Sequence, residues 1–276
     1  MGIAGRLLGG SGYSHRHLFR SLVDCAGAAD LRQWPVERRQ HALRRLDQRA
    51  PAPTSSTRSP AGQRDPIMRP RLCILARSPE LGVGKRRLAA SLGDAATLAV
   101  YQALLRQLAR ALPGWPGPMT LFLDGPVEAL QDSGLDDLPC QDQAGGSLAQ
   151  RMQATLGSAL SQGPALIIGT DTPLIQAQHL AAMAELLNHH EVAIGPARDG
   201  GYWALGLRSP RYLATCCAED LPWSSSQLLQ ATQSTLASAG CHPALGPLLM
   251  DLDTAEDLHH AQSLGFTLGT PSPSSA

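Results

Sequence analysis

The sequence predicts an α/β fold, a three-layer α/β/α sandwich around a mostly parallel, mixed sheet. From residue 71 onward, apolar strand-like runs alternate with helix-like stretches, a pattern typical of parallel sheets. The strand-like runs are apolar along their whole length, as in strands that are covered on both faces. The short connection in "RDGGYW" fits a hairpin turn better than a helical crossover, so some antiparallel pairing is expected.

The elements follow one another regularly along the chain. The expected strands are "LCILA" (72–76), "MTLFLD" (119–124), "ALIIGT" (165–170), "EVAIGPA" (191–197) and "YWALGL" (202–207). The expected helices span about 92–111, 147–161, 176–189, 224–239 and 254–264. The stretch "PCQDQA" is not expected to form a strand.

The charge distribution separates an N-terminal extension from this domain. The net charge is zero, but residues 1–70 contain 12 Arg and 5 acidic residues, whereas the rest contains 11 Lys and Arg and 18 acidic residues. Residues 1–67 include a Pro-, Ser- and Thr-rich linker that cannot build a core, so disorder is expected there. Three interpretations are open: an overcalled start before Met68, a basic arm, or a plain extension. Residues 68–268 form the predicted domain, and 269–276 a disordered tail.

Composition excludes several protein classes. An apolar fraction of 43% suffices for a core, but no apolar stretch approaches the roughly 20 residues that span a bilayer. No secretory signal is recognised, and the six scattered cysteines form no CxxC pair, which favours reduced thiols and a cytoplasmic location. The arginines of the extension lack interleaved aromatic residues, so nucleic acid is not an expected partner. The oligomeric state is left open.

The loop after the first strand, "RSPELGVGKRRL", suits a bound anion. Gly82 and Gly84 permit close backbone approach, and main-chain N–H groups at a helix start favour negative charge. Arg77 and Lys85, the sole lysine of the chain, add positive charge. The loop matches neither GxxxxGK[ST] nor GxGxxG, so it predicts a phosphate site of another kind. A basic helix start without function is the alternative.

Two carboxylates follow predicted strands and could share a metal ion. Asp171 comes directly after an apolar strand, where an unpaired charge would be costly. Asp253 precedes Thr254, which with Asp257 fits a capping box. Magnesium commonly takes one or two carboxylates and completes its shell with water and phosphate. The alternative for Asp171 is a helix N-cap.

The hairpin "GPARDGGYW" allows two interpretations. Asp199 before Gly200 and Gly201 is a plain turn signal. A second glycine also indicates that something approaches the backbone closely, and Asp199 could then bind a sugar hydroxyl or help to hold the metal.

Taken together, six motifs in this order resemble a known family: "RSPELGVGKRRL", "QAGGSLAQRM", "IIGTDTP", "GPARDGGYWALGL", "LPWSSSQLL" and "DLDTAEDL". The family is a bacterial one of GT-A-like proteins in the nucleotide-diphospho-sugar transferase superfamily. Its members are labelled domain-of-unknown-function proteins or arsenosugar-biosynthesis-type glycosyltransferases, and it is similar to 2-phospho-lactate guanylyltransferase. The resemblance covers about 71–266.

The resemblance implies roles for individual residues. The donor would be bound by Arg77, Pro79, Gly82, Lys85, Arg87, Arg151 and Asp171. A divalent cation, Mg²⁺ or Mn²⁺, would be held by Asp171 and Asp253. The acceptor would lie near Asp199, Gly200, Gly201, Tyr202 and Trp223, and the implied catalytic residues are Lys85, Asp171 and Asp199. Gln143 matches the family's second motif, whereas Arg86 and Ser147 depart from its pattern.

The function expected from this set is a metal-dependent transfer from a nucleotide donor to a small-molecule acceptor. Glycosyl transfer from a nucleoside-diphosphate sugar is the leading prediction, and nucleotidyl transfer from a nucleoside triphosphate is the alternative. A non-catalytic nucleotide- or ligand-binding protein is the second alternative. A serine hydrolase is disfavoured because "GGSLA" has Ala149 where the nucleophile motif requires glycine.

Overall fold

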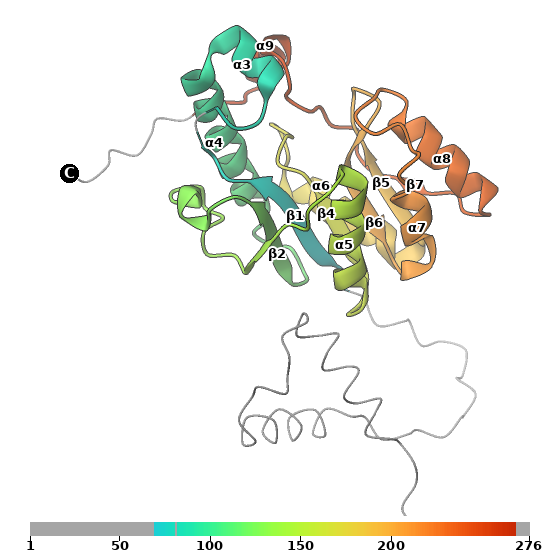
Figure 1. The fold of residues 1–276 in the computed structure, drawn as a ribbon. Helices are drawn as coiled ribbons and strands as arrows, with labels where there is room; N and C mark the ends of the chain where they lie inside the picture. The colour runs from blue at the N-terminus through green and yellow to red at the C-terminus, as the bar shows by residue number, and fades with distance from the viewer. Residues whose placement is uncertain (1–68, 81, 269–276) are drawn as a thin grey trace, which may run out of the picture. The chain divides into compact units, whose positions relative to one another are not determined.

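A computed structural model describes residues 69–80 and 82–268 (Figure 1). The predicted extension at 1–67 and the tail at 269–276 lie outside these residues. The described part has helices on both faces of a seven-stranded sheet with the order β3-β2-β1-β4-β6-β5-β7. The predicted fold class, with a mostly parallel but mixed sheet, is therefore confirmed.

The strands pair in parallel except for β6, which runs antiparallel to both of its neighbours. The β5–β6 hairpin is the one that the "RDGGYW" connection predicted. The strands are β1 (Arg71–Arg77), β2 (Met119–Asp124), β3 (Cys140–Asp142), β4 (Ala165–Ile168), β5 (Val192–Pro196), β6 (Tyr202–Leu207) and β7 (Ala244–Leu245).

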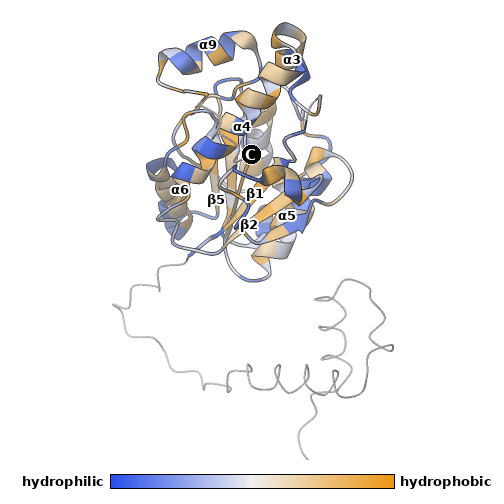
Figure 2. Cartoon of the chain, turned by 90° about the vertical axis from the view of Figure 1, so that its left-hand side faces the viewer, coloured by the Kyte–Doolittle hydropathy of each residue, from blue (hydrophilic) through white to orange (hydrophobic). Residues whose placement is uncertain are grey.

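Side chains of the sheet build one hydrophobic core on each face. Along β1, Leu72 and Ile74 enter one core, while Cys73 between them enters the other. The first core is covered by α3 (Arg86–Leu92), α4 (Asp94–Ala111), α6 (Ala177–His189) and α9 (Ala255–Ser263), and the second by α5 (Leu148–Leu160), α7 (Leu213–Cys216) and α8 (Leu228–Ser238). Hydrophobic colour concentrates on the strands, and several helices show hydrophilic colour outward (Figure 2). Burial on both faces explains why the strands are continuously apolar.

Short or interrupted elements differ from the sequence predictions. The expected helix at 92–111 is two helices, because Gly93 has a φ of 78° and separates α3 from α4. The expected helix at 224–239 begins only at Leu228. The prediction of no strand in "PCQDQA" is wrong, since Cys140–Asp142 form the edge strand β3. All three residues of β3 are exposed, so the strand has no apolar signature. β7 was not predicted either, because it has only two residues.

Two helices, α9 and α5, begin with capping side chains from their own sequence. Thr254 caps α9 through a capping box with Asp257, as predicted. Ser147, where the family pattern has Asp, caps α5 by accepting a hydrogen bond from the main-chain N–H of Gln150. Within the described residues, no helix combines the length and apolar character needed to cross a membrane.

Candidate active site

The carboxyl ends of the parallel strands bring distant loops together. β1 and β4 are parallel neighbours, so the loop that starts at Arg77 and the segment that leads to Asp171 leave the same edge of the sheet. The C-terminal acidic segment joins them, because the main-chain N–H of Leu252 donates to the carbonyl of Asp171 over 2.9 Å. Ligands of open α/β sheets bind at this edge. The structure thus unites three segments that lie about 80 residues or more apart in the sequence.

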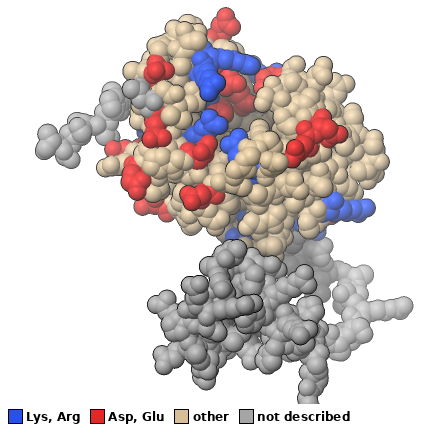
Figure 3. Space-filling model, viewed as in Figure 1, with Lys and Arg blue, Asp and Glu red and all other residues tan. Residues whose placement is uncertain are grey.

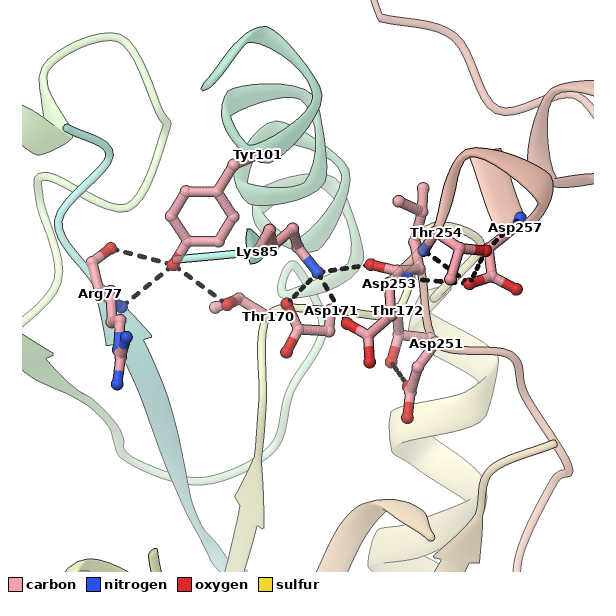
Figure 4. Close-up of polar contacts among 11 residues, drawn as sticks. Arg77, Lys85, Tyr101, Thr170, Asp171, Thr172, Asp251, Asp253, Thr254 and Asp257 are labelled. Carbon is pink, nitrogen blue, oxygen red and sulfur yellow. Dashed lines mark hydrogen bonds and ion pairs between the residues drawn. The ribbon is translucent and has the colours of Figure 1, made fainter. Parts of the chain in front are cut away.

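Lys85 lies between the two carboxylates that the sequence predicted as metal ligands (Figure 4). Its Nζ is 2.7 Å from Oδ1 of Asp171 and 3.6 Å from Oδ1 of Asp253, and it donates to the carbonyl of Leu252 over 2.5 Å. The Lys85 side chain is 8% exposed, whereas both carboxylates are about half exposed. Burial lowers the pKa of Lys85, but Asp171 and Asp253 outweigh burial and raise it, so the ammonium stays charged.

The backbone of Lys85 is also unusual. It is the N-cap of α3 and adopts a left-handed conformation with a φ of 37°. Non-glycine residues enter this region infrequently. In this conformation Lys85 turns inward to Asp171, while the following residues, Arg86 and Arg87, are exposed.

Tyr101 of α4 contacts the carboxyl end of β1 and the segment after β4 (Figure 4). Its hydroxyl accepts from the main-chain N–H of Arg77 over 3.0 Å, donates to the Arg77 carbonyl over 2.9 Å, and lies 3.2 Å from Oγ1 of Thr170. Burial raises the pKa of Tyr101, so the hydroxyl remains protonated. Tyr101 therefore ties the end of β1 to the segment that carries Asp171.

Two arginines form a second charged group beside the first. Arg77 Nε lies 3.4 Å from Oδ2 of Asp124, and Arg151 Nη1 lies 4.0 Å from the same oxygen. Arg151 Nη1 also donates to Oε1 of Gln143 over 3.1 Å. The amide nitrogen of Gln143 donates to main-chain carbonyls of β1 and β2 over 2.6 and 3.0 Å. These hydrogen bonds fix the orientation of the Gln143 side chain, which in turn orients the Arg151 guanidinium group.

These side chains surround a cavity of about 390 Å³. Basic and acidic residues gather around a hollow on this face of the molecule (Figure 3). Of the residues predicted for the site, the cavity is lined by Arg77, Lys85, Arg151, Asp171, Tyr202, Trp223 and Asp253. The structure thus brings both predicted metal residues and part of the predicted donor and acceptor residues into one space.

The other predicted residues do not line this cavity. Pro79, Gly82 and Arg87 lie in or after the first loop, outside the lining. Asp199 uses Oδ1 to accept from the main-chain N–H of Gly201 over 2.9 Å, which is a turn contact. Gly200 has a φ of 90°, and a β-carbon there would collide with the main chain of Ser226.

Asp251 adds a further carboxyl group behind the two that face Lys85. Burial raises the pKa of Asp251 to about 7, and repulsion from Asp171, Asp199 and Asp253 adds to the shift. Its Oδ1 accepts from Oγ1 of Thr172 over 3.4 Å. Negative charge in this part of the site is therefore in excess over the ammonium of Lys85.

The carboxylate oxygens of the site fit a divalent cation. Asp171 and Asp253 already converge on one positive charge, the Lys85 ammonium, and their half-exposed oxygens can reach a cation in the cavity. Among the described residues no cluster of three or more His, Cys, Asp and Glu side chains converges on a metal position. Two carboxylates nevertheless suffice for Mg²⁺ or Mn²⁺ when water and substrate phosphate complete the shell.

Sequence reasoning missed two residues of the site. Asp124 is the last residue of β2 and orients both arginines. The rule that ligands bind at the carboxyl ends of strands would have found it. Tyr101 is a buried residue in the middle of α4, and nothing in the helix pattern distinguishes it from a core residue.

The comparisons with known proteins agree with this fold. Residues 104–225 match the model of the family described as "Uncharacterized protein conserved in bacteria (DUF2064)". A protein from Desulfovibrio desulfuricans G20, assigned as a nucleotide-diphospho-sugar transferase, superposes with a TM-score of 0.62 at 24% identity, covering 68% of this chain and 84% of that one. This likeness shows the fold. The predicted resemblance to a bacterial family of unknown function is therefore confirmed.

Two further solved structures are more distant. 4-Diphosphocytidyl-2C-methyl-D-erythritol synthase from Anaerococcus prevotii DSM 20548 has a TM-score of 0.47 at 10% identity, covering 71% of this chain and 96% of that one. Rv0371C of Mycobacterium tuberculosis H37Rv, in complex with manganese, has a TM-score of 0.43 at 16% identity, covering 70% and 98%. At these TM-scores neither likeness supports a functional conclusion. No curated protein gives a significant match to the chain.

Proposed function

We propose that the protein is a metal-dependent transferase that uses a nucleotide donor, with a nucleoside-diphosphate sugar as the donor. The observation that carries the proposal is the convergence of Asp171 and Asp253 on one cation position in a cavity that Arg77 and Arg151 also line. A diphosphate needs cationic partners, and a cation needs carboxylates, so both sets in one cavity suit a metal–nucleotide complex. The name given to the Desulfovibrio neighbour agrees with a sugar donor.

In this proposal the side chains of the cavity divide the work. Arg77 and the Nη groups of Arg151 bind phosphate oxygens, and Asp124 and Gln143 hold the two guanidinium groups in place. Lys85 is close enough to Asp171 to contact a phosphate that binds at the cation. Asp171 and Asp253 would hold a divalent cation, which would supply positive charge to offset the charge on the leaving group.

The transfer step then breaks one bond and forms one. An acceptor oxygen bonds to the anomeric carbon of the sugar, while the bond from that carbon to the β-phosphate oxygen breaks. The nucleoside diphosphate leaves with the bonding electrons, and the acceptor proton passes to solvent. Lys85 and the arginines stabilise the negative charge that builds on the leaving phosphate. Asp199 is assigned to the turn, since its carboxylate is engaged by Gly201.

A thermal-shift panel on the full chain tests the donor site. Nucleoside triphosphates and nucleoside-diphosphate sugars are compared with and without Mn²⁺. We expect a metal-dependent rise in the unfolding midpoint with one nucleoside-diphosphate sugar, and loss of that rise in Asp171→Asn. Asp136→Asn, an exposed carboxylate outside the cavity, is the matched control. No rise with any nucleotide would contradict the proposal and favour a protein that does not use nucleotides.

Product analysis then separates the two transfer reactions. Release of a nucleoside diphosphate supports glycosyl transfer. Release of pyrophosphate from a nucleoside triphosphate would contradict the sugar donor and establish nucleotidyl transfer. Nucleotide binding without any release would identify a non-catalytic binding protein.

A further inference from the structure

The cavity has an apolar end that the donor proposal does not use. Beyond the charged groups, its lining comes from side chains of the second core: Leu75, Met152, Ile167, Tyr202, Leu205 and Trp223. Leu148 and Leu228, at the first residues of α5 and α8, also line it. The charged lining residues are Arg77, Lys85, Arg151, Asp171 and Asp253. The apolar end is therefore a recess of the hydrophobic core that opens toward the charged end.

Polar side chains in this recess are already occupied by the protein. Nε1 of Trp223 donates to the carbonyl of Ala218 over 2.9 Å, so the indole N–H of this side chain already has a partner. A sugar-like ligand would have to desolvate several hydroxyl groups here without receiving partners. Each hydroxyl group that is left without a partner weakens binding. The recess consequently disfavours a polyhydroxylated body and favours an apolar one.

Two polar atoms of cavity-lining residues are exceptions. Four buried side-chain polar atoms in the described part of the chain lack a hydrogen-bond partner, and two of them, Nε of Arg151 and Oη of Tyr202, belong to cavity-lining residues. Leu148, Arg151 and Met152 of α5 all line the cavity, and Leu148 lies three residues before Arg151 and four before Met152, on the same helix face as each. The Nε–H of Arg151 can therefore meet a ligand whose apolar body contacts the other two side chains.

Resting on the proposed function, we propose the class of its acceptor: a small molecule with an aromatic or otherwise apolar body and one anionic or hydrogen-bond-accepting group that Arg151 binds. The apolar body lies between α5 and the Tyr202–Trp223 pair, whose rings meet edge to face with centroids 6.4 Å apart. A cavity of about 390 Å³ lies in the range of small-molecule sites. The acceptor oxygen then points toward the charged end, where the donor binds.

Two fluorescent probes with the same ring systems test this inference on the full chain. 1-Anilinonaphthalene-8-sulfonate carries an anionic group, and N-phenyl-1-naphthylamine is its uncharged counterpart. We expect both to bind with one-to-one stoichiometry, and Arg151→Met to weaken the sulfonate about tenfold or more while leaving the uncharged probe unchanged. Equal effects on both probes, or no binding of either, would overturn the proposal.

A second variant tests the apolar lining without risking the core. Leu148 is 36% exposed and is the first residue of α5, where an acidic residue is compatible with the helix start. We expect Leu148→Glu to weaken both probes about tenfold. Leu248→Glu, at a leucine that is 59% exposed and outside the cavity, is the matched control and should leave both affinities unchanged. If the two variants behave alike, the probes bind elsewhere and the inference fails.

The donor panel separates this inference from the proposed function. Addition of Mn²⁺ and the nucleotide that gives a thermal shift should leave the probes bound, because donor and acceptor occupy different ends of the cavity. Displacement by the donor would overturn the inference while leaving the donor site intact. Probe binding without any nucleotide response would instead contradict the donor proposal and leave the apolar recess as a ligand site.

Discussion

The two ends of the cavity differ in how the chain builds them. The lysine and the two carboxylates of the charged end lie outside the strands: Lys85 follows β1, Asp171 follows β4, and Asp253 follows the last strand. The apolar end is assembled from the interiors of elements, such as Met152 within α5 and Leu205 within β6. Loop residues vary independently of the core, whereas residues of the apolar end also hold the fold together. A change at the charged end should therefore alter chemistry, and a change at the apolar end should alter chemistry and stability together.

Removal of the Asp171 carboxylate is expected to have the largest effect on the charged end of the cavity. We expect Asp171→Asn to lower transfer on the order of 10³-fold, because the variant loses both the cation ligand and the partner of Lys85. Steady-state kinetics with the donor found in the thermal-shift panel gives the measurement. Asp136→Asn should retain wild-type rates, and a fully active Asp171→Asn would contradict the assignment.

Removal of Lys85 separates its role in transfer from the role of the two carboxylates in metal binding at the charged end of the cavity. We expect Lys85→Met to lower transfer on the order of 10²-fold, as when one charged donor to a leaving group is lost. The same variant should bind Mn²⁺ more tightly in the absence of nucleotide, because the ammonium no longer occupies the carboxylates. Arg86→Met, an exposed neighbour outside the cavity, serves as the control. Weaker Mn²⁺ binding by Lys85→Met would argue that lysine and metal do not share this position.

The hairpin at residues 199–201 is expected to affect the stability of the fold. Gly200 has a positive φ, and a β-carbon would collide with the main chain of Ser226. We expect Gly200→Ala to lower the free energy of unfolding by about 2 kcal/mol or more. Urea denaturation measures the change. Gly145→Ala is the control, since its φ is ordinary and its surroundings are open. An undiminished stability of Gly200→Ala would contradict the close contact between Gly200 and the main chain of Ser226.

The acidic excess at the charged end should appear as a pH dependence of stability. The folded pKa of Asp251 is about 7, above its ordinary value of 3.8, so the folded state retains a proton that the unfolded state has lost. Stability from this group is fully present at low pH and is lost as the pH rises from about 4 through about 7. We expect the unfolding midpoint of the metal-free protein to fall between pH 5 and pH 8, with a smaller fall in Asp251→Asn. Identical slopes in both proteins would contradict the raised pKa.

The fold could be predicted further from the sequence than the site. Continuous apolar strands and the Asp-Gly-Gly turn specified a mixed sheet with covered faces, because burial on both faces leaves a direct mark on composition. Edge strand β3 escaped prediction because its three residues are exposed and polar. Motifs at strand ends predicted Lys85, Asp171 and Asp253 as site residues, because a charged side chain directly after an apolar strand is costly unless it has a function or a partner. Tyr101 and the apolar recess could not be predicted, because their residues have the same pattern as ordinary core.

The central claim is that Asp171 and Asp253 hold a divalent cation at the phosphates of a nucleotide donor. Electron paramagnetic resonance of Mn²⁺, titrated into the full chain with and without the nucleotide of the thermal-shift panel, tests it most directly. We expect one bound Mn²⁺ whose affinity rises at least about tenfold with nucleotide, and loss of that gain in both Asp171→Asn and Asp253→Asn. Equal Mn²⁺ binding by the wild type and both variants, or no effect of nucleotide, would contradict the claim.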